Sequence, residues 1–181
     1  MSYDSKAVLR DIVSRTRENL GLGITKPNLF KYDVTHLINS MLGLLVIPQQ
    51  LLSKKAKKEN FEKIEERLDS GIIEKFKAVS GKYSSDLKLE DICKCLRDSL
   101  AHGNFCFFHN HAEIKSLTFT DYNYFGKNGK PLKKPKKTYE SKKIDIDVIK
   151  QFIDKFSNAI LECLESNDLK YDDLKCQPLL T

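Results

Sequence analysis

An arginine and a histidine separated by four residues are the side chains in this sequence best suited to chemistry on a phosphate. They are Arg97 and His102, with Asp98 directly after the arginine and Gly103 directly after the histidine. A guanidinium can hold a phosphate through two hydrogen bonds, and an imidazole can exchange a proton near neutral pH. Together the two groups could cleave RNA without a metal ion, with the 2′-hydroxyl of the RNA as the nucleophile.

The segment that carries this pair is expected to be a helix that ends at the histidine. Residues 86–101 place apolar side chains at helical spacing, and the glycine after the histidine suits the left-handed turn that follows a helix. Ser85 or Asp86 is expected to cap its first turn. On an ideal helix, residues five apart point about 140° away from each other. Arg97 and His102 alone therefore do not make one preorganised site, although a helix that ends at the histidine frees its side chain.

Helical spacing of apolar residues predicts further helices on both sides of this segment. They are expected at residues 4–19, 29–52, 60–79 and 145–164. Gly21 and Gly23 should end the first of them. The second is apolar almost all round toward its end, so we expect it to be the central buried helix, kinked or ended by Pro48.

Between the Arg–His helix and the last helix, the spacing of apolar residues changes to that of strands. Strands are expected at residues 105–108, 114–120 and, as a short third one, 138–140. The first turn between them holds His109 and His111, and the Asn128-Gly129 pair is a strong hairpin signal. The expected fold class is mainly α, with about five helices and a small antiparallel sheet inserted before the last helix.

The composition is that of a single domain with a basic balance. The chain has 181 residues, 40% hydrophobic content and a net charge of +6, which suffices for one core and permits a polyanionic partner. It contains no apolar run of the roughly 18 residues that a membrane span requires. The first residues also lack the apolar core of a signal peptide, so we expect a cytoplasmic protein that does not enter membranes.

The cysteines and histidines do not have the spacing of a metal site. Cys93 and Cys95 are one residue apart, and the other three cysteines are scattered, so no pair fits a zinc site. We expect reduced thiols that pack as small apolar side chains. His109 and His111 have no cysteine or carboxylate at ligand spacing. No metal and no cofactor are therefore expected.

A lysine-rich segment lies in the expected hairpin. Its central lysines are Lys133, Lys134, Lys136 and Lys137. Lysine clusters bind phosphate backbones without reading sequence. Aromatic residues that could stack on bases flank the cluster, namely Tyr122, Tyr124, Phe125 and Tyr139. The alternative is a solvated segment that keeps the protein soluble.

The Arg–His segment resembles the signature of the HEPN superfamily (higher eukaryotes and prokaryotes nucleotide-binding domains). Arg97, Asp98 and His102 match that signature position by position. Residues 33–48 are also similar to the second helix of a plasmid-encoded HEPN subfamily, in which a short β insertion and a final helix likewise follow the motif helix. The resemblance spans roughly residues 11–164. It implies a HEPN-like helical bundle at residues 1–165, with the lysine-rich hairpin insertion at 104–143 and a tail at 166–181.

The resemblance implies a metal-independent endoribonuclease. In HEPN nucleases two chains form a two-fold dimer that brings two Arg-x4-His motifs into one cleft, and the products carry a 2′,3′-cyclic phosphate and a 5′-hydroxyl. His102 would then take or donate a proton, and Arg97 would neutralise the phosphorane. Asp98 would orient the imidazole or the guanidinium, and Ser99 could bind the phosphate.

Three further polar residues are candidates for supporting the motif. His36 and Asn39 lie in the apolar second helix and would line the same cleft, or they are satisfied polar groups at the edge of the core. Asn104 stands where some HEPN toxins carry a tyrosine that a partner nucleotidyltransferase modifies. Control by that modification is therefore not expected here.

Two kinds of function remain open. The resemblance favours a homodimeric ribonuclease that acts on RNA as a toxin or abortive phage-defence effector, restrained by an antitoxin or regulatory protein. The alternative is a non-catalytic HEPN module that binds a nucleotide or RNA, or docks a partner protein. In that case His102 would be a polar residue favoured at a helix C-terminus, and Arg97 an exposed helix arginine. The presence of both residues favours the enzyme.

Overall fold

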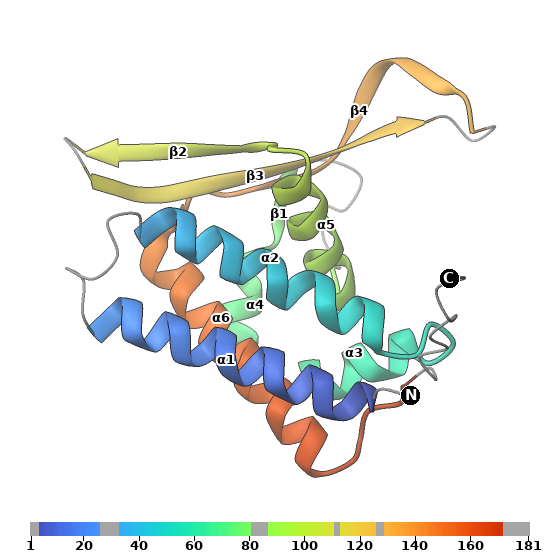
Figure 1. Ribbon diagram of the computed structural model, residues 1–181. Helices are drawn as coiled ribbons and strands as arrows, with labels where there is room; N and C mark the ends of the chain where they lie inside the picture. Colours follow the sequence, from blue (N-terminus) through green and yellow to red (C-terminus); the bar gives the residue numbers. More distant parts are fainter. Residues whose placement is uncertain (1–3, 26–32, 81–86, 111–112, 126–128, 172–181) are drawn as a thin grey trace, which may run out of the picture. The chain divides into compact units, whose positions relative to one another are not determined.

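The fold is mostly helical, with a small antiparallel sheet. The computed structural model describes residues 4–25, 33–80, 87–110, 113–125 and 129–171 (Figure 1). The elements in this part of the chain are α1 (Ser5–Thr25), α2 (Asp33–Leu51), α3 (Lys57–Glu65), α4 (Ser70–Glu74), β1 (Ala78–Ser80), α5 (Leu89–Ala101), β2 (Phe105–Asn110), β3 (Glu113–Phe125), β4 (Pro131–Ser141), β5 (Ile144–Asp145) and α6 (Ile146–Glu165). The helix α6 begins and ends one residue later than expected.

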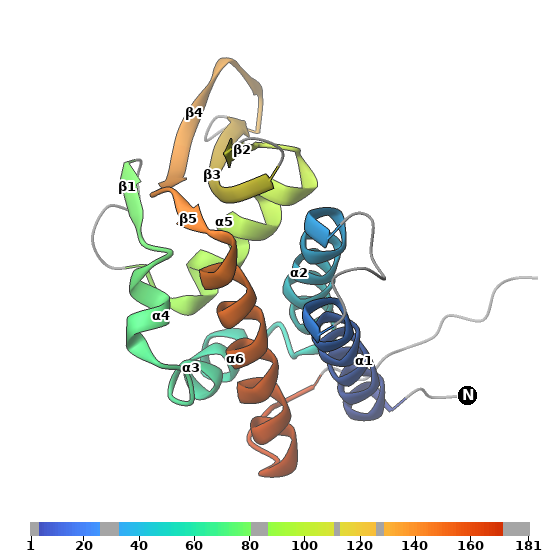
Figure 2. The ribbon, with the colours of Figure 1, turned by 90° about the vertical axis from the view of Figure 1, so that its left-hand side faces the viewer.

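Within the helical part, α1 and α2 lie side by side (Figure 2). The expected end of α1 at its glycines is wrong, because the helix continues to Thr25. A glycine costs a helix interior only about 1 kcal/mol, whereas Pro27 disfavours helix in the residue before it. The helix α2 includes Pro48 and continues to Leu51. No helix in the described ranges is long and apolar enough to cross a membrane.

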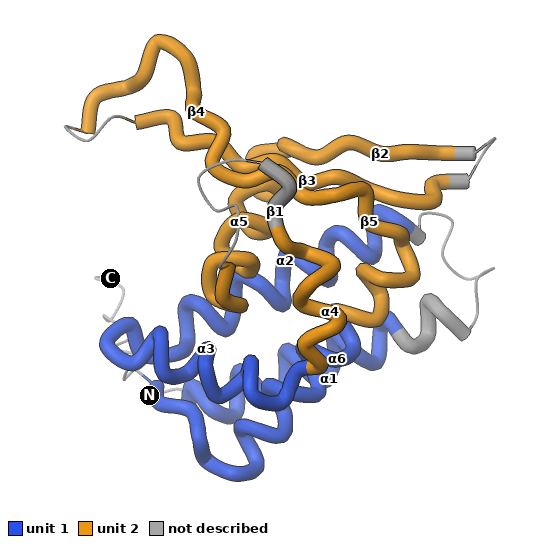
Figure 3. Tube along the Cα trace, turned by 180° about the vertical axis from the view of Figure 1, so that it is seen from behind, with its two compact units in different colours: residues 1–68, 153–181 blue, residues 69–152 orange. Residues whose placement is uncertain are grey.

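The chain forms two compact units (Figure 3). Residues 1–68 and 153–181 make the first unit, and residues 69–152 make the second. The first unit buries the apolar stripes of its helices, with Leu9 and Val13 of α1 and Leu37, Met41 and Leu44 of α2 at most 2% exposed. The second unit holds Arg97, His102 and the whole sheet.

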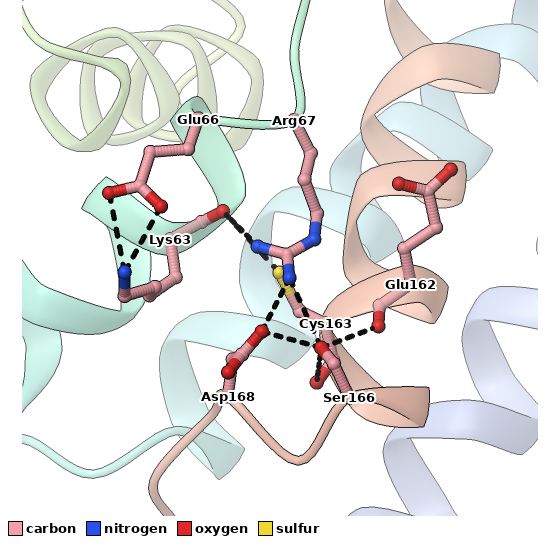
Figure 4. A network of polar contacts seen from close by, with 7 residues as sticks. All are labelled: Lys63, Glu66, Arg67, Glu162, Cys163, Ser166 and Asp168. Atoms are coloured by element: carbon pink, nitrogen blue, oxygen red, sulfur yellow. Dashed lines mark hydrogen bonds and ion pairs between the residues drawn. The ribbon is translucent and has the colours of Figure 1, made fainter.

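The residues after α6 are bound to the rest of the first unit by polar contacts (Figure 4). The Arg67 guanidinium forms an ion pair with Asp168, and it donates to the Ser166 hydroxyl at 3.1 Å and to the Lys63 carbonyl at 3.0 Å. Lys170, two residues after Asp168, is bound through its backbone. The buried Asn60 side chain donates to the Lys170 carbonyl at 2.9 Å. It also accepts from the Lys170 backbone N–H at 2.8 Å. Residues 166–171 of the expected tail therefore belong to the first unit.

Replacing Asp168 by asparagine should lower the free energy of unfolding at neutral pH but not in acid. The hydrogen bond from the Ser166 hydroxyl, and then Arg67, lower the pKa of Asp168. A carboxyl whose pKa is lower in the folded chain stabilises the fold above its unfolded pKa, and this contribution disappears as the pH falls through the folded value. The unfolding free energies of wild type and Asp168→Asn, measured by urea titration, should therefore converge at pH values below the usual carboxyl pKa.

The matched control is Asp154→Asn. Asp154 pairs with Arg17 at 3.0 Å, but the two side chains are 56% and 46% exposed, and exposed ion pairs contribute little to stability. We expect the control to unfold like wild type at every pH. Equal effects of the two substitutions would contradict the assignment of a stabilising role to the Arg67–Asp168 pair.

In the second unit, helix α5 contacts the central strand of an antiparallel sheet. The strand order is β1-β4-β3-β2, and β5 pairs with β3. In the β2–β3 ladder, Phe105 lies opposite Phe119 and Phe107 opposite Leu117. Leu117 and Phe119 are buried. The strands expected at residues 105–108 and 114–120 are confirmed, and both extend further than expected.

The lysine-rich segment is part of strand β4, which is much longer than the expected 138–140. Asn123 of β3 lies opposite Lys136, and Phe125 lies opposite Pro131. Residues 132–135 thus form a bulge opposite the single residue Tyr124. Proline, which has no backbone N–H to donate to a ladder, is found in sheets at edges and bulges, and Pro135 lies in this bulge.

The prediction of one continuous helix at 60–79 is wrong, although the apolar spacing correctly identifies the buried residues. The structure has α3, α4 and β1 in its place. The Asp69 side chain caps α4 by accepting from the Gly71 N–H at 2.8 Å, and such a cap favours a new helix start over continuation. Ile64, Leu68 and Ile72 are nevertheless buried, as the spacing predicts.

Candidate functional site

Helix α5 ends at the histidine, as the sequence predicts. His102 is the C-cap residue, and Gly103 has the left-handed φ of +67°. The Gly103 N–H donates to the Leu100 carbonyl at 3.2 Å, and the Asn104 N–H donates to the Ser99 carbonyl at 2.8 Å. These two bonds are the Schellman motif that closes many helices. His102 is exposed at this end.

The chain passes from this cap directly into the sheet, which fixes His102 relative to β3. The Asn104 carbonyl accepts from the Thr120 N–H at 2.8 Å, and the Asn104 side chain donates to the Tyr124 hydroxyl at 3.2 Å. The rings of His102 and Tyr124 lie 5.9 Å apart between centroids. Asn104, a supporting candidate from the sequence, therefore links the helix end to the strand beside the histidine.

Replacing Gly103 by valine should destabilise the second unit and displace His102. No atom lies within 4 Å of an added Cβ, so the penalty comes from the backbone conformation alone. A left-handed residue with a Cβ costs roughly 1–2 kcal/mol. Asparagine tolerates this region better, so Gly103→Asn is the matched control and should lose less stability in urea unfolding. A valine variant as stable as wild type would contradict the role of this glycine.

Arg97 is held by its neighbour in the sequence. Its Nε and Nη2 donate to Asp98 Oδ1 at 2.8 and 2.6 Å. The two side chains are 31% and 24% exposed. The sequence left open whether Asp98 orients the imidazole or the guanidinium, and in the structure Asp98 binds the guanidinium. About a third of the Arg97 side chain is therefore exposed to solvent.

Two candidate residues are buried in ways that the sequence did not indicate. Ser99 is fully buried, and its hydroxyl donates to the Cys95 carbonyl at 2.7 Å, so the hydroxyl has no exposed surface for a phosphate. Tyr139 is also fully buried, and its hydroxyl donates to the Phe76 carbonyl at 2.6 Å. The expected phosphate contact of Ser99 and base stacking of Tyr139 are therefore corrected to structural roles.

A groove of about 420 Å³ lies beside His102, between α5 and the end of β3. Its lining residues are Lys94, Cys95, Asp98, His102, Asp121, Tyr122, Asn123, Tyr124, Phe125 and Thr138. Arg97 is not among them. Because burial raises the pKa of the Cys95 thiol to about 12, this thiol stays protonated and unreactive at neutral pH.

Asp121, the most buried carboxyl of the groove, was not among the candidates predicted from the sequence. Its side chain accepts from the Tyr122 N–H and from the Thr138 hydroxyl, both at 2.8 Å. Burial raises the pKa of Asp121, and the nearby Asp98 raises it further. The sequence did carry a signal for it. Side chains alternate between the two faces of a strand, and Asp121 falls on the same buried face of β3 as Leu117 and Phe119.

The central lysines are all exposed on β4. Lys136 lies opposite Asn123 and Lys137 opposite Tyr122, so both lie beside strand residues that line the groove. The Lys137 ammonium pairs with Glu140 at 3.0 Å, and the two side chains are 39% and 35% exposed. The strand therefore presents positive charge next to the groove.

Other candidates lie elsewhere. His36 and Asn39 are on α2 in the first unit, so their place in a common cleft with Arg97 and His102 stays a prediction. His109 lies on β2 opposite Ile114 and not in a turn, and His111 falls outside the described residues. Among the residues that the structure describes, no three His, Cys, Asp or Glu side chains gather as metal ligands would.

Of the four cysteines in the described part of the chain, three are buried as expected. Cys93, Cys95 and Cys163 are buried, as small apolar side chains would be, whereas Cys106 on β2 is exposed. Cys176 falls outside the described residues.

Comparison with known proteins identifies the family of the chain. The model of a family described as HEPN pEK499 p136 matches residues 1–168. No curated protein and no solved structure matches the chain. The family match includes α5, the groove and every element through α6, and it confirms the HEPN resemblance seen in the sequence. This chain belongs to the HEPN pEK499 p136 family.

Proposed function

We propose that this protein is a metal-independent endoribonuclease of the HEPN type. The observation that carries the proposal is the exposed His102 at the rim of the groove, fixed by a helix cap and by the link of Asn104 to β3. The His102 imidazole takes the proton of the RNA 2′-hydroxyl, whose oxygen attacks the adjacent phosphorus. The bond between the phosphorus and the 5′-oxygen breaks, the 5′-oxygen takes a proton from water, and the products carry a 2′,3′-cyclic phosphate and a 5′-hydroxyl.

The arrangement of Arg97 supports an active site shared by two copies of the chain. His102 lines the groove, but Arg97 does not, so one chain does not present both side chains to the same groove. A two-fold interface is self-complementary and can bring the arginine of one chain to the histidine of the other. In such a cleft Arg97, positioned by Asp98, stabilises the charge that develops on the phosphorane.

The lysines of β4 supply the nonspecific part of RNA binding in this proposal. Lys133, Lys134, Lys136 and Lys137 are exposed, and such charges bind phosphates regardless of sequence. The biological role that fits this activity is a cytoplasmic toxin or abortive phage-defence effector, which an antitoxin or regulatory partner restrains.

One observation favours the alternative of a non-catalytic HEPN module. Two nitrogens of Arg97 are bound to Asp98, so part of its hydrogen-bonding capacity is used within the chain. A module that binds a nucleotide or RNA, or docks a protein, would bind without cleavage. Incubation of the purified protein with total cellular RNA, followed by analysis of the product ends, distinguishes the two functions.

A single deoxynucleotide at the cleaved position should block cleavage there, because the 2′-hydroxyl is the nucleophile. The substrate is an RNA oligonucleotide, and the product ends are identified by mass spectrometry. A deoxynucleotide one position away is the control and should leave the cut intact. Excess EDTA should not change the rate. Cleavage of an all-DNA strand at a comparable rate would refute the 2′-hydroxyl mechanism.

A further inference from the structure

We propose that the groove beside His102 binds one unpaired guanine base of the RNA, through the aromatic rings at its rim and the carboxylates within it. The inference deepens the proposed function and rests on it for the identity of the ligand as RNA. It assigns the groove to base recognition and leaves the phosphates to Arg97 and the lysines of β4. Every residue that lines the groove belongs to the second unit.

The size and rim of the groove fit a planar base. A volume of about 420 Å³ lies within the usual range of small-molecule sites. Tyr124 and Phe125 at its rim are 37% and 56% exposed. Tyr124 lies 5.9 Å from the His102 ring and 6.3 Å from the Tyr122 ring, between centroids. Exposed rings of this kind stack on unpaired bases, and stacking on Tyr124 would place a base next to His102.

At the rim of the groove, a hydrogen bond holds the Tyr124 ring, and another holds the backbone of Phe125. The Asn104 side chain holds the Tyr124 hydroxyl at 3.2 Å. The Phe125 N–H donates to the Asn123 side chain at 3.1 Å, which fixes the end of β3. Preorganised groups lose less conformational entropy on binding than flexible ones. The rim is therefore suited to hold a base and not only to cover the sheet.

The interior of the groove holds the carboxyl groups of Asp121 and Asp98 beside the ammonium of Lys94, and the carboxyl oxygens offer acceptors to the edge of a base. Asp121 is 9% exposed, and its oxygens already accept from the Tyr122 N–H and the Thr138 hydroxyl. Each carboxylate oxygen has a second lone pair for a further donor. Asp98 lines the same groove and is bonded to Arg97, which leaves Asp121 as the carboxyl group for a base edge. A base edge that donates hydrogen bonds fits this lining.

Guanine is the RNA base whose edge matches a carboxylate best. Its N1–H and N2–H groups are adjacent donors that can pair with the two oxygens of one carboxylate. Adenine and cytosine present one amino donor beside an acceptor, and uracil presents one N–H between two acceptors. The phosphates on either side of the bound base would then run along β4, where Lys136 and Lys137 lie opposite residues of the groove.

The test measures binding without cleavage. The probes are uridine oligonucleotides with 2′-fluorine in place of every 2′-hydroxyl, which removes the nucleophile, and with one central guanine, adenine, cytosine or hypoxanthine base. Wild-type protein should bind the guanine probe on the order of 10-fold more tightly than the adenine probe. The hypoxanthine probe, which keeps N1–H and lacks the amino group, should fall between them. Equal affinities for all four probes would overturn the inference.

Two variants distinguish recognition of the base edge by Asp121 from stacking of the base on Tyr124. Asp121→Asn should remove most of the preference for guanine over adenine. Tyr124→Leu should weaken all four probes by a common factor, on the order of 10-fold, and keep the preference, because stacking tolerates every base. Circular dichroism checks the fold of each variant. If Asp121→Asn does not fold, the hypoxanthine probe and Tyr124→Leu still decide the result.

The outcomes for the base site and for the nuclease are distinguishable. A preference for guanine in a protein that never cleaves RNA would support the base site and refute the nuclease. Cleavage of RNA by a protein with no base preference in the binding assay would refute the base site and leave the nuclease standing. A preference that survives in Asp121→Asn unchanged would overturn the role of that carboxylate.

Discussion

Replacing His102 by alanine should lower the rate of RNA cleavage by about 10²–10⁴-fold, the usual effect of losing a general acid or base. The side chain is exposed at the C-cap of α5, and the cap itself is closed by backbone bonds of Gly103 and Asn104. The variant should therefore keep its fold. Single-turnover cleavage rates, together with thermal unfolding of the same samples, separate a chemical defect from a structural one.

The matched control is His109→Ala. His109 is also an exposed histidine of the second unit, on β2, but it does not line the groove. Its replacement should leave the cleavage rate unchanged. If His102→Ala cleaves RNA as fast as wild type, the assignment of the proton-transfer role to His102 is wrong.

Replacing Phe76 by alanine should lower the free energy of unfolding by about 3–5 kcal/mol, the usual cost of removing a buried phenylalanine. Phe76 is fully buried, and its ring lies 4.5 Å from that of Phe152 between centroids. Its carbonyl also accepts the hydroxyl of the buried Tyr139 at 2.6 Å. A cavity here would therefore weaken the contact between the segment after α4 and strand β4.

Phe125→Ala is the control for this substitution, because Phe125 is 56% exposed. Its loss should change the unfolding free energy by no more than about 0.5 kcal/mol, as for most surface positions. Urea titrations of both variants at the same pH test the pair. A Phe76→Ala variant as stable as Phe125→Ala would show that the site around Phe76 collapses without cost.

The elements with uninterrupted apolar spacing could be predicted from the sequence. The spacing places α6 to within a residue, and the glycine after His102 marks the end of α5. The helix expected at 60–79 failed because Asp69 starts a new helix, and a local cap competes with apolar spacing that looks continuous. Strand β4 was underestimated because lysine and proline have low strand propensity, and its length comes from pairing with β3.

The chemistry of the motif could be read from the sequence, but its surroundings could not. Arg97, Asp98 and His102 are neighbours along one helix, so local spacing reveals them. Asp121 and Tyr124 line the same groove as His102 only through the packing of β3 on α5, and such packing depends on strand register. Ser99 was misjudged for a similar reason, because the tertiary fold decides which face of α5 is buried.

Because of the bulge in β4, the length of the lysine-rich segment can change while the strand pairing next to the groove stays the same. The pairs Asn123–Lys136 and Phe125–Pro131 hold the ladder on either side of residues 132–135. Insertions or deletions between these two pairs should leave the Asn123–Lys136 pair, and with it the register at Asp121, in place. Related chains can thus vary the reach and charge of this segment while keeping the same site. In the laboratory, the bulge is the place to insert a fluorescent reporter or an affinity tag that keeps the register at Asp121.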